Sequence, residues 1–239
     1  MIFMEYLVLW DIDWTMYPEL PACVEGRLLG SAIEDIKDGE FASCLAKGLE
    51  QAMQATEAER QGIVSNGISD EQRKKIKGFG IEKYVNPELI LISHEMAQAD
   101  LEQNIDRWDF ANAEYLHKMR NLRRCIDAAQ AMPEYRHIEK WDKPGSLMIE
   151  VAAGRFVDYA LRTGKKIELP RENVFYIGDR EKDMKAVTSY GGRGIHVRSR
   201  NNDSLESIPE EVRKKHITCI EYSDYPWINE IVLGLLRGS

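Results

Sequence analysis

The stretch YLVLWDIDWT, residues Tyr6 to Thr15, runs an apolar strand into two aspartates, Asp11 and Asp13, one residue apart. The run from Tyr6 to Trp10 is typical of a strand that is buried on both faces. One polar residue would end such a strand equally well, because aspartate favours turns. The pair taken alone is more typical of a turn than of a catalytic site, so its meaning depends on residues farther along the chain.

Four further apolar runs that end in polar or glycine residues predict buried strands: Gly62 to Val64, Leu89 to Ile92, Val174 to Ile177 and Gly194 to Val197. Helical stretches lie between several of them. Ser69 with Gln72 resembles a capping box that opens a helix ending near Gly78 and Gly80, and Lys182 to Tyr190 is followed by the stop residue Gly191. This alternation predicts an α/β fold, a Rossmann-like parallel sheet covered by helices on both faces.

Polar residues follow three of the predicted strands. They are the pairs Asp11 and Asp13, Ser65 and Asn66, and Gly178 and Asp179. In open parallel sheets the ligand crevice lies at the carboxyl ends of the strands. We therefore expect these three pairs to meet at one edge of the sheet.

Composition limits the kind of protein this is. The 239 residues are 44% hydrophobic and carry a formal net charge of -8, which fits one folded domain with an insertion and argues against a nucleic-acid partner. The four cysteines form no CxxC pair, which favours a reducing, cytoplasmic compartment. The apolar start is interrupted by Glu5 and lacks a basic region, and no window is long enough for a bilayer, so neither a signal peptide nor a membrane is expected.

Four motifs in chain order resemble the haloacid dehalogenase-like (HAD) superfamily of phosphohydrolases. They are DIDWT, the strand end at Ser65, DKPG with Lys143 before a helix, and YIGDREKD with Asp179 and Asp183. The match runs from Leu7 to about Val197. Trp14 departs from the pattern, because the family often has a small or polar residue there, and a long segment separates Ser65 from Lys143.

The chemistry of a phosphate monoester explains why two aspartates would be needed. The ester is a dianion, so an attacking carboxylate needs a neighbouring cation such as magnesium to offset repulsion. Asp11 is the candidate nucleophile that forms an aspartyl-phosphate, and Asp13 could protonate the leaving oxygen and then take a proton from water.

The resemblance also implies the remaining roles. Mg²⁺ would be bound by Asp11, by the main-chain carbonyl of Asp13 and by Asp179, with Asp183 in support. Lys143 would supply a fixed ammonium, and the residues that hold the substrate and its loop would be Thr15, Ser65 and Asn66. Each of these residues alone has an ordinary structural explanation; the functional interpretation depends on their occurring together.

A helical cap is predicted from 95 to 141, between core segments 1–94 and 142–239. Glu95 to Met132 contains neither glycine nor proline and carries a heptad-like apolar stripe. A straight helix of that length would extend about 50 Å, whereas Pro133 to Trp141 could return at most about 30 Å. We therefore predict a bend around Asp109 to Ala113 and a small lid, with a paired helix in a homodimer as the alternative.

A basic cluster lies in the second half of this segment. It comprises Lys118, Arg120, Arg123 and Arg124. A charge match with the acidic first half is favoured over contacts to substrate phosphate.

The resulting hypothesis is a magnesium-dependent phosphatase that hydrolyses a small phosphorylated metabolite. A phosphomutase of the same superfamily is a close alternative, and dehalogenase chemistry is disfavoured because Asp13 would have no leaving oxygen to protonate. A response-regulator type of phosphoacceptor module would be about half as long and lack the insertion. A non-catalytic phospho-ligand binding protein would be expected to have lost Asp11, Asp13 or Lys143, and all three are present.

Overall fold

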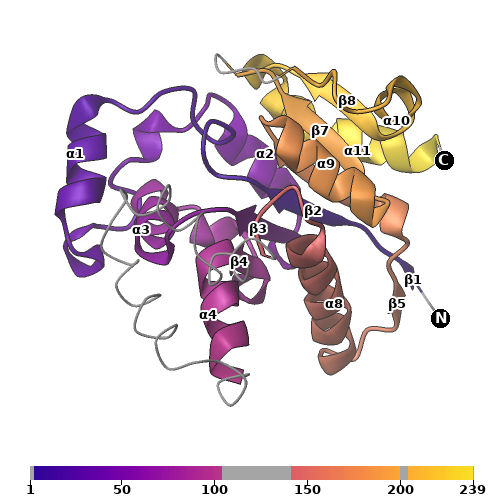
Figure 1. The fold of residues 1–239 in the computed structure, drawn as a ribbon, viewed down its shortest axis with the longest axis horizontal. Coiled ribbons are helices and arrows are strands. Elements are labelled where there is room, and N and C mark those ends of the chain that lie inside the picture. Colours follow the sequence, from indigo (N-terminus) through magenta and orange to yellow (C-terminus); the bar gives the residue numbers. More distant parts are fainter. Residues whose placement is uncertain (1–2, 104–140, 200–203, 239) are drawn as a thin grey trace.

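A six-stranded parallel sheet forms the centre of the molecule. The computed structural model describes residues 3–103, 141–199 and 204–238, and its sheet has the strand order β4-β3-β2-β6-β7-β8 (Figure 1). The strands are β2 (Leu7–Trp10), β3 (Gln61–Ser65), β4 (Ile90–Ile92), β6 (Val174–Gly178), β7 (Arg193–Val197) and β8 (Ile217–Ile220). A separate pair of short parallel strands, β1 (Phe3–Met4) and β5 (Ile167–Glu168), lies beside it. The predicted α/β class with a Rossmann-like parallel sheet is confirmed.

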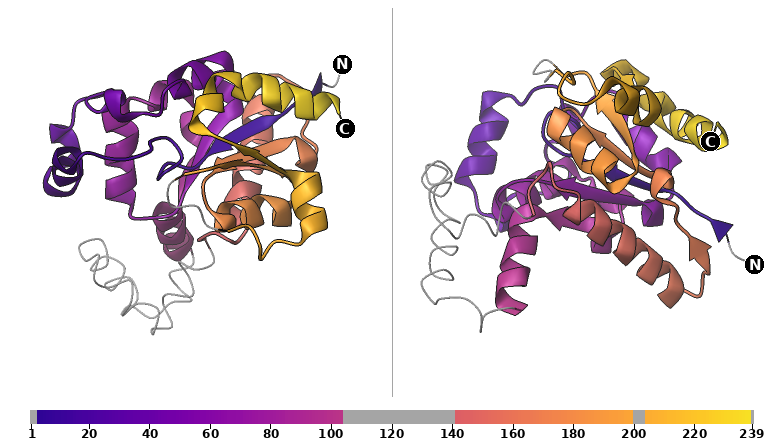
Figure 2. Two further views of the ribbon diagram at one scale, coloured as in Figure 1. Left: turned by 90° about the horizontal axis from the view of Figure 1, so that it is seen from above. Right: turned by 45° about the vertical axis from the view of Figure 1, so that its right-hand side comes forward.

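Helices connect the strands. The α-helices are α1 (Ala22–Gly30), α2 (Leu49–Ala55), α3 (Ser69–Phe79), α4 (Ser93–Gln103), α8 (Leu147–Arg162), α9 (Glu181–Tyr190), α10 (Glu210–His216) and α11 (Ile228–Arg237). Short 3-10 turns cover Ile33–Asp35, Ala42–Cys44, Ala58–Arg60, Glu82–Tyr84, Pro87–Leu89, Arg171–Asn173 and Tyr222–Trp227. Figure 2 shows helices on both sides of the sheet, as the βα alternation of the sequence predicts.

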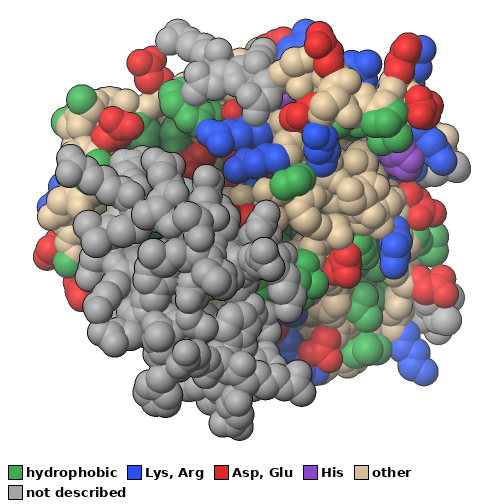
Figure 3. Space-filling model, viewed as in Figure 1, with side chains coloured by type: hydrophobic (Ala, Val, Ile, Leu, Met, Phe, Trp, Pro, Cys, Tyr) green, Lys and Arg blue, Asp and Glu red, His purple; other side chains and the backbone are tan. Residues whose placement is uncertain are grey.

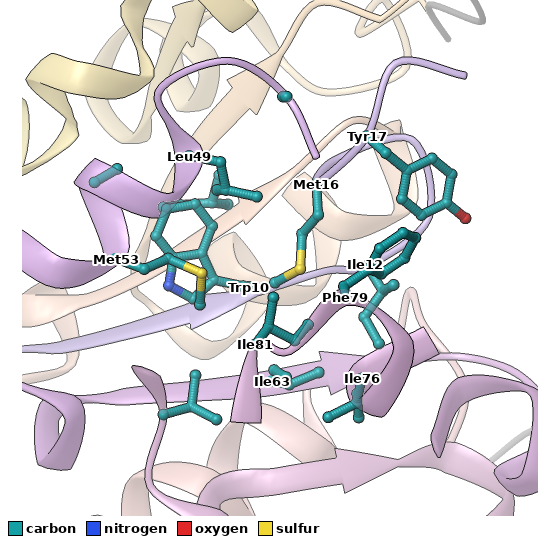
Figure 4. Close-up of a cluster of buried hydrophobic side chains, with 14 of the residues drawn as sticks. Trp10, Ile12, Met16, Tyr17, Leu49, Met53, Ile63, Ile76, Phe79 and Ile81 are labelled. Atoms are coloured by element: carbon teal, nitrogen blue, oxygen red, sulfur yellow. The ribbon is translucent and has the colours of Figure 1, made fainter. Parts of the chain in front are cut away.

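Each face of the sheet has its own hydrophobic core, because successive side chains of a strand point to opposite faces. Trp10 of β2 packs in one core with side chains of α2 and α3, and Figure 4 shows it among Met16, Leu49 and Met53. Leu9, its neighbour in the same strand, packs in the other core with residues of α8 and α9. This double burial explains why the strands are continuous apolar runs rather than alternating ones.

All five predicted strands exist, with ends that differ by at most one residue. Three strands were not predicted: β1, β5 and β8. β1 and β5 have two residues each and pair with each other. β8 is one of the two edge strands and, unlike the other edge strand β4, is only partly buried, so its apolar signal is weaker.

The helix predicted from Ser69 is confirmed, but its capping box is wrong. The residue at the cap position is Ile68, whose side chain makes no cap hydrogen bond, and the amide of Ser69 donates to Nδ1 of His94 at 3.4 Å. Ser69 donates its hydroxyl to Glu95, and Gln72 donates to Asp13, so both side chains bind long-range partners instead of the helix end. At the other end Gly80 takes the left-handed conformation at φ 64°, and Gly191 likewise ends α9.

The predicted cap falls almost entirely on residues 104–140, which lie outside the described residues. The bend at Asp109 to Ala113 and the basic cluster from Lys118 to Arg124 therefore stay predictions. Within the described ranges, no helix is long and apolar enough to cross a membrane. Acidic and basic side chains are interspersed over the face shown in Figure 3.

Candidate functional site

The site begins where β2 ends between its two neighbours. β2 pairs with β3 on one side and with β6 on the other. The amide of Asp11 continues this pairing and donates to the carbonyl of Ile177 at 2.9 Å. Asp11 therefore lies beside Gly178 and Asp179, at the carboxyl edge where these residues were expected.

Three carboxylates form the centre of the site. Oxygens of Asp11, Asp179 and Asp183 lie within 4.8 Å of one another, and all three residues are buried. Asp183 comes from the first turn of α9, where its Oδ2 accepts a hydrogen bond from the amide of Arg180 at 3.0 Å. The helix start thus fixes the third carboxylate against the two strand ends.

Lys143 is the cation of this cluster. Its Nζ lies 2.7 Å from Oδ1 of Asp11, 2.7 Å from Oδ1 of Asp183 and 2.7 Å from the hydroxyl of Tyr176. Its side chain is 2% exposed. The contacts with Asp11 and Tyr176 are hydrogen bonds, and the contact with Asp183 is an ion pair. Lys143 therefore acts on the site through its charge and by holding Asp11.

The pKa values of the cluster reflect its burial and its excess of acids. Burial, reinforced by Asp183 and Asp13 and opposed by Lys143, raises the pKa of Asp11 to about 6. Burial and the charges of Asp11 and Asp183 raise the pKa of Asp179 to about 7. Burial opposes the charge of Lys143, but Asp11 and Asp183 together raise its pKa well above the ordinary value. The lysine stays protonated, while two of the acids hold protons more tightly than exposed carboxyls do.

Asp179 has one oxygen that the protein leaves open. Its Oδ2 accepts from the hydroxyl of Ser199 at 3.0 Å, and a ring nitrogen of His196 lies 2.9 Å from its main-chain oxygen. Its Oδ1 is buried and has no hydrogen-bond partner among the described residues. An orphaned carboxylate oxygen beside two other carboxylates is the donor set that Mg²⁺ takes. The residues present therefore fit a magnesium ion.

The carboxylate of Asp13 binds residues outside the cluster of Asp11, Asp179 and Asp183. Its carboxylate accepts from Lys75 at 2.5 Å, from Gln72 at 3.0 Å and from the hydroxyl of Tyr17. Burial acts to raise its pKa, but the charge and hydrogen bond of Lys75, with the bonds from Tyr17 and Gln72, lower it below the ordinary value. In this conformation Asp13 is ionised, and its carboxylate accepts hydrogen bonds from all three of these residues.

The chain turns sharply after Asp13. Trp14 has a φ of 58°, the left-handed region that a bulky residue rarely adopts. Its carbonyl accepts the hydroxyl of Tyr222, and the next carbonyl, that of Thr15, accepts the hydroxyl of Tyr225. Tyr222 and Tyr225 thus hold the turn that follows Asp13.

The three residues assigned to substrate binding occupy different places. Ser65 is the last residue of β3 and is buried; among the described residues its hydroxyl donates to the carbonyl of Asn66 at a long 3.4 Å. Asn66 accepts the amide of Lys143 at 3.1 Å and thereby positions the lysine loop. Thr15 is buried, with a hydroxyl that has no partner among the described residues. Ser65 lies on the strand next to Asp11, whereas the contacts of Asn66 and Thr15 are those of loop supports.

Several residues that shape the site received no role from the sequence, although Tyr176 lies at the start of the YIGDREKD stretch. Tyr176 orients Lys143 and donates its hydroxyl to the carbonyl of Val64 at 2.6 Å. Lys75 and Ser199 each hold one of the aspartates. A tyrosine within an apolar strand and a lysine on a charged helix are both ordinary, so no sequence pattern marks them. Their role comes from strand register and helix packing.

The strand-end aspartates, the lysine and the GDREKD aspartates thus converge on one small volume in a parallel α/β sheet. These are the motifs whose sequence resembles the HAD superfamily, and the structure brings them together in space. No family model and no curated protein matches the sequence. Two of the solved structures to which the chain is similar share 12% sequence identity with it. One is a putative beta-phosphoglucomutase from Thermotoga maritima, with 96% of this chain and 100% of that chain covered and a TM-score of 0.49.

The second is a conserved HAD-like protein of unknown function from Agrobacterium tumefaciens, with 91% of this chain and 72% of that chain covered and a TM-score of 0.45. With TM-scores below 0.5, neither likeness fixes a reaction or a substrate. The chemistry of this chain has to be argued from its own side chains.

Proposed function

We propose that the protein is a magnesium-dependent phosphatase that hydrolyses a small phosphate monoester through an aspartyl-phosphate on Asp11. The observation that carries this proposal is the buried cluster of Asp11, Asp179 and Asp183 around Lys143. Three acids against one contacting ammonium leave an excess of negative charge, which costs free energy unless a cation shares the site. A stable fold has little reason to keep such a cluster without a function.

Asp11 is the nucleophile of the proposed reaction. Lys143 holds its Oδ1 at 2.7 Å and so fixes the direction of the carboxylate. Its pKa of about 6 keeps it ionised near neutral pH while making it a stronger base than an exposed aspartate. Attack on phosphorus forms the new P–O bond as the bond to the leaving alcohol breaks.

Asp13 is the general acid and base of the proposed reaction. The ionised form that Lys75, Gln72 and Tyr17 stabilise is the form that takes a proton from the water which attacks the aspartyl-phosphate. Donating a proton to the leaving alcohol in the first step requires that the contact with Lys75 loosen. Ser65, at the end of the neighbouring strand, supplies a hydroxyl for a phosphoryl oxygen.

Asp11, Asp179 and Asp183 would hold the magnesium ion, with the main-chain carbonyl of Asp13 as a further candidate. When bound, magnesium supplies positive charge that offsets the repulsion between the phosphate dianion and the carboxylates. Its removal by a chelator is expected to abolish turnover.

The test is phosphate release from a panel of small phosphate esters, including para-nitrophenyl phosphate, by the parent protein and by Asp11→Asn. We expect magnesium-dependent release that the substitution abolishes while the circular dichroism spectrum is unchanged. Release that persists in Asp11→Asn would reject the assigned nucleophile. Release that appears only with a bisphosphate activator, together with transfer to another hydroxyl, would identify a phosphomutase instead.

A further inference from the structure

A cavity opens on the Asp13 side of the site. It has a volume of about 440 Å³, and among the described residues it is lined by the loop after β2, by α1 and α3, and by Arg180. Pockets for small ligands span about 300–1,000 Å³. The cavity is therefore large enough for a small alcohol and a few water molecules.

The position of Asp13 in the wall of this cavity indicates which part of a substrate would lie there. In the proposed reaction Asp13 exchanges a proton with the leaving oxygen, which must lie within hydrogen-bond distance of its carboxylate. The phosphoryl group of the ester would lie at Asp11, in the carboxylate cluster. The alcohol that carries the leaving oxygen would therefore extend past Asp13 into the cavity.

Trp14 is one of the residues that line the cavity. Its ring centroid lies 6.4 Å from that of Tyr17, and the ring of Tyr17 packs 5.2 Å from that of Phe79 in the hydrophobic core (Figure 4). Leu20 and Leu28 also line the cavity. The indole is thus supported from the core side through Tyr17 and forms part of an apolar wall of the cavity.

Core packing does not explain the indole of Trp14. This residue belongs to neither of the two hydrophobic cores that the described residues form. Its φ of 58° lies in the left-handed region, which glycine or asparagine adopts at a lower cost in free energy. Tyr222 holds the turn through the main-chain carbonyl of Trp14, a contact that any residue at this position could make. A strained conformation of this kind is retained where the side chain that it places has a use, and the cavity offers the indole a ligand to contact.

We infer that Trp14 contacts the alcohol of the phosphate ester and selects alcohols that carry an apolar ring over short acyclic alcohols. The inference rests on the proposed function and adds the substrate class. An indole is a large, flat apolar surface, and other rings pack against it by stacking or by edge-to-face contact. A short acyclic alcohol covers little of that surface and gains less from the contact.

The test compares kcat/KM for benzyl phosphate and ethyl phosphate. Both are alkyl phosphates, so their leaving oxygens are of similar basicity and the comparison reports on the ring. We expect the parent protein to prefer benzyl phosphate by about tenfold or more, because burial of a ring against an apolar surface is worth about that factor. In Trp14→Asn the ratio should approach one. The loss should appear in KM rather than in kcat, because a contact with the alcohol is made in the ground state and in the transition state alike.

Three further variants separate contact with the ring from support of the loop. Glycine and asparagine both adopt the left-handed conformation readily, so Trp14→Gly should give the same ratio as Trp14→Asn. Trp14→Phe keeps an aromatic ring and should keep most of the preference. The matched control Trp227→Asn removes an indole that is 61% exposed and does not line the cavity, so it should leave the ratio unchanged.

Equal values of kcat/KM for the two esters in the parent, or the ratio of the parent in both Trp14→Asn and Trp14→Gly, would overturn this inference and leave the phosphatase intact. An equal fall of kcat/KM for both esters gives that unchanged ratio and would assign Trp14 to the loop instead. Absence of phosphate release from any ester by the parent would overturn the proposed function and this inference with it.

Discussion

At the scale of single residues, Lys143 decides how much charge the site can tolerate. It is the ammonium that contacts Asp11 and Asp183, and its side chain is 2% exposed. Tyr176 accepts a hydrogen bond from the lysine and donates its own hydroxyl to the carbonyl of Val64. Hydrogen bonds to Asp11 and Tyr176 and an ion pair with Asp183 therefore fix the lysine before any substrate arrives, which is the preorganisation that catalysis by charge requires.

Replacing this lysine should be costly for folding as well as for activity. We expect Lys143→Gln to lower the free energy of unfolding by about 3–5 kcal/mol without magnesium, because it leaves buried carboxylates uncompensated. Urea denaturation of the metal-free protein measures the loss. The matched control is Lys165→Gln, whose partner Glu59 is at the surface, with an expected loss of under about 1 kcal/mol. Equal losses in the two variants would contradict the role given to the buried ammonium.

The sequence identifies the motif residues of this site better than it identifies the residues that hold them in place. The aspartates of DIDWT and GDREKD, and Lys143, could be found because they recur at strand ends and at a helix start. Tyr176, Lys75 and Ser199 could not, since each acts through a contact between residues far apart in the chain, as with the 62 positions between Asp13 and Lys75. Such contacts depend on the packing of α3 and β6 rather than on local spacing.

At the scale of secondary-structure elements, β6 and α9 meet at a glycine. A Cβ at Gly178 would lie 2.6 Å from Oδ2 of Asp183 and 2.7 Å from its Cβ. The end of β6 therefore has no room for a side chain while Asp183 caps α9 and contacts Lys143. The glycine of the GDREKD motif is required by this close approach.

A pair of glycine substitutions tests that requirement. Gly178→Ala should destabilise the protein by about 1–3 kcal/mol and weaken magnesium binding, because it displaces Asp183. Gly154→Ala, in the interior of α8 with nothing within 4 Å of the added Cβ, should stabilise it by about 0.5–1 kcal/mol. Thermal unfolding and magnesium titration of both variants provide the readouts. Unchanged magnesium affinity in Gly178→Ala would show that Asp183 is dispensable for the ion.

The elements themselves were predictable where both faces of the sheet are covered. β2, β3 and β6 are buried throughout, so their apolar runs stand out. β8 lies at an edge of the sheet, and its residues are only partly buried, so its apolar run stands out less. The capping box predicted at Ser69 is wrong because the hydroxyl of Ser69 binds Glu95 instead of the helix end. Local patterns are reliable only where no distant side chain offers a stronger partner.

At the scale of the whole molecule, the site links stability to both pH and magnesium. The pKa values of Asp11, about 6, and Asp179, about 7, lie above the ordinary 3.8 of aspartate. In the metal-free protein the fold therefore favours their protonated forms, and their contribution to stability is lost as pH rises from about 4 to about 7. Magnesium binds the ionised forms and competes with those protons.

The magnesium-induced rise in melting temperature should thus be larger at pH about 8 than at pH about 5.5, where both acids hold protons. Scanning calorimetry with and without magnesium at the two pH values measures it. Asp179→Asn, which lacks one of these titrating groups, should show a smaller dependence on pH. A rise that is equal at both pH values would mean that the ion binds elsewhere.

One ion pair joins the two helices that flank the site. Arg73 of α3 binds Glu95 of α4 through two hydrogen bonds of 2.8 and 2.7 Å, and Ser69 adds a third at 2.6 Å. The same α3 carries Gln72 and Lys75, which hold Asp13. Rotation or sliding of α4 would therefore move α3 with it and change the contacts of the proton carrier, so that a mechanical signal could travel along the helical layer without passing through the sheet.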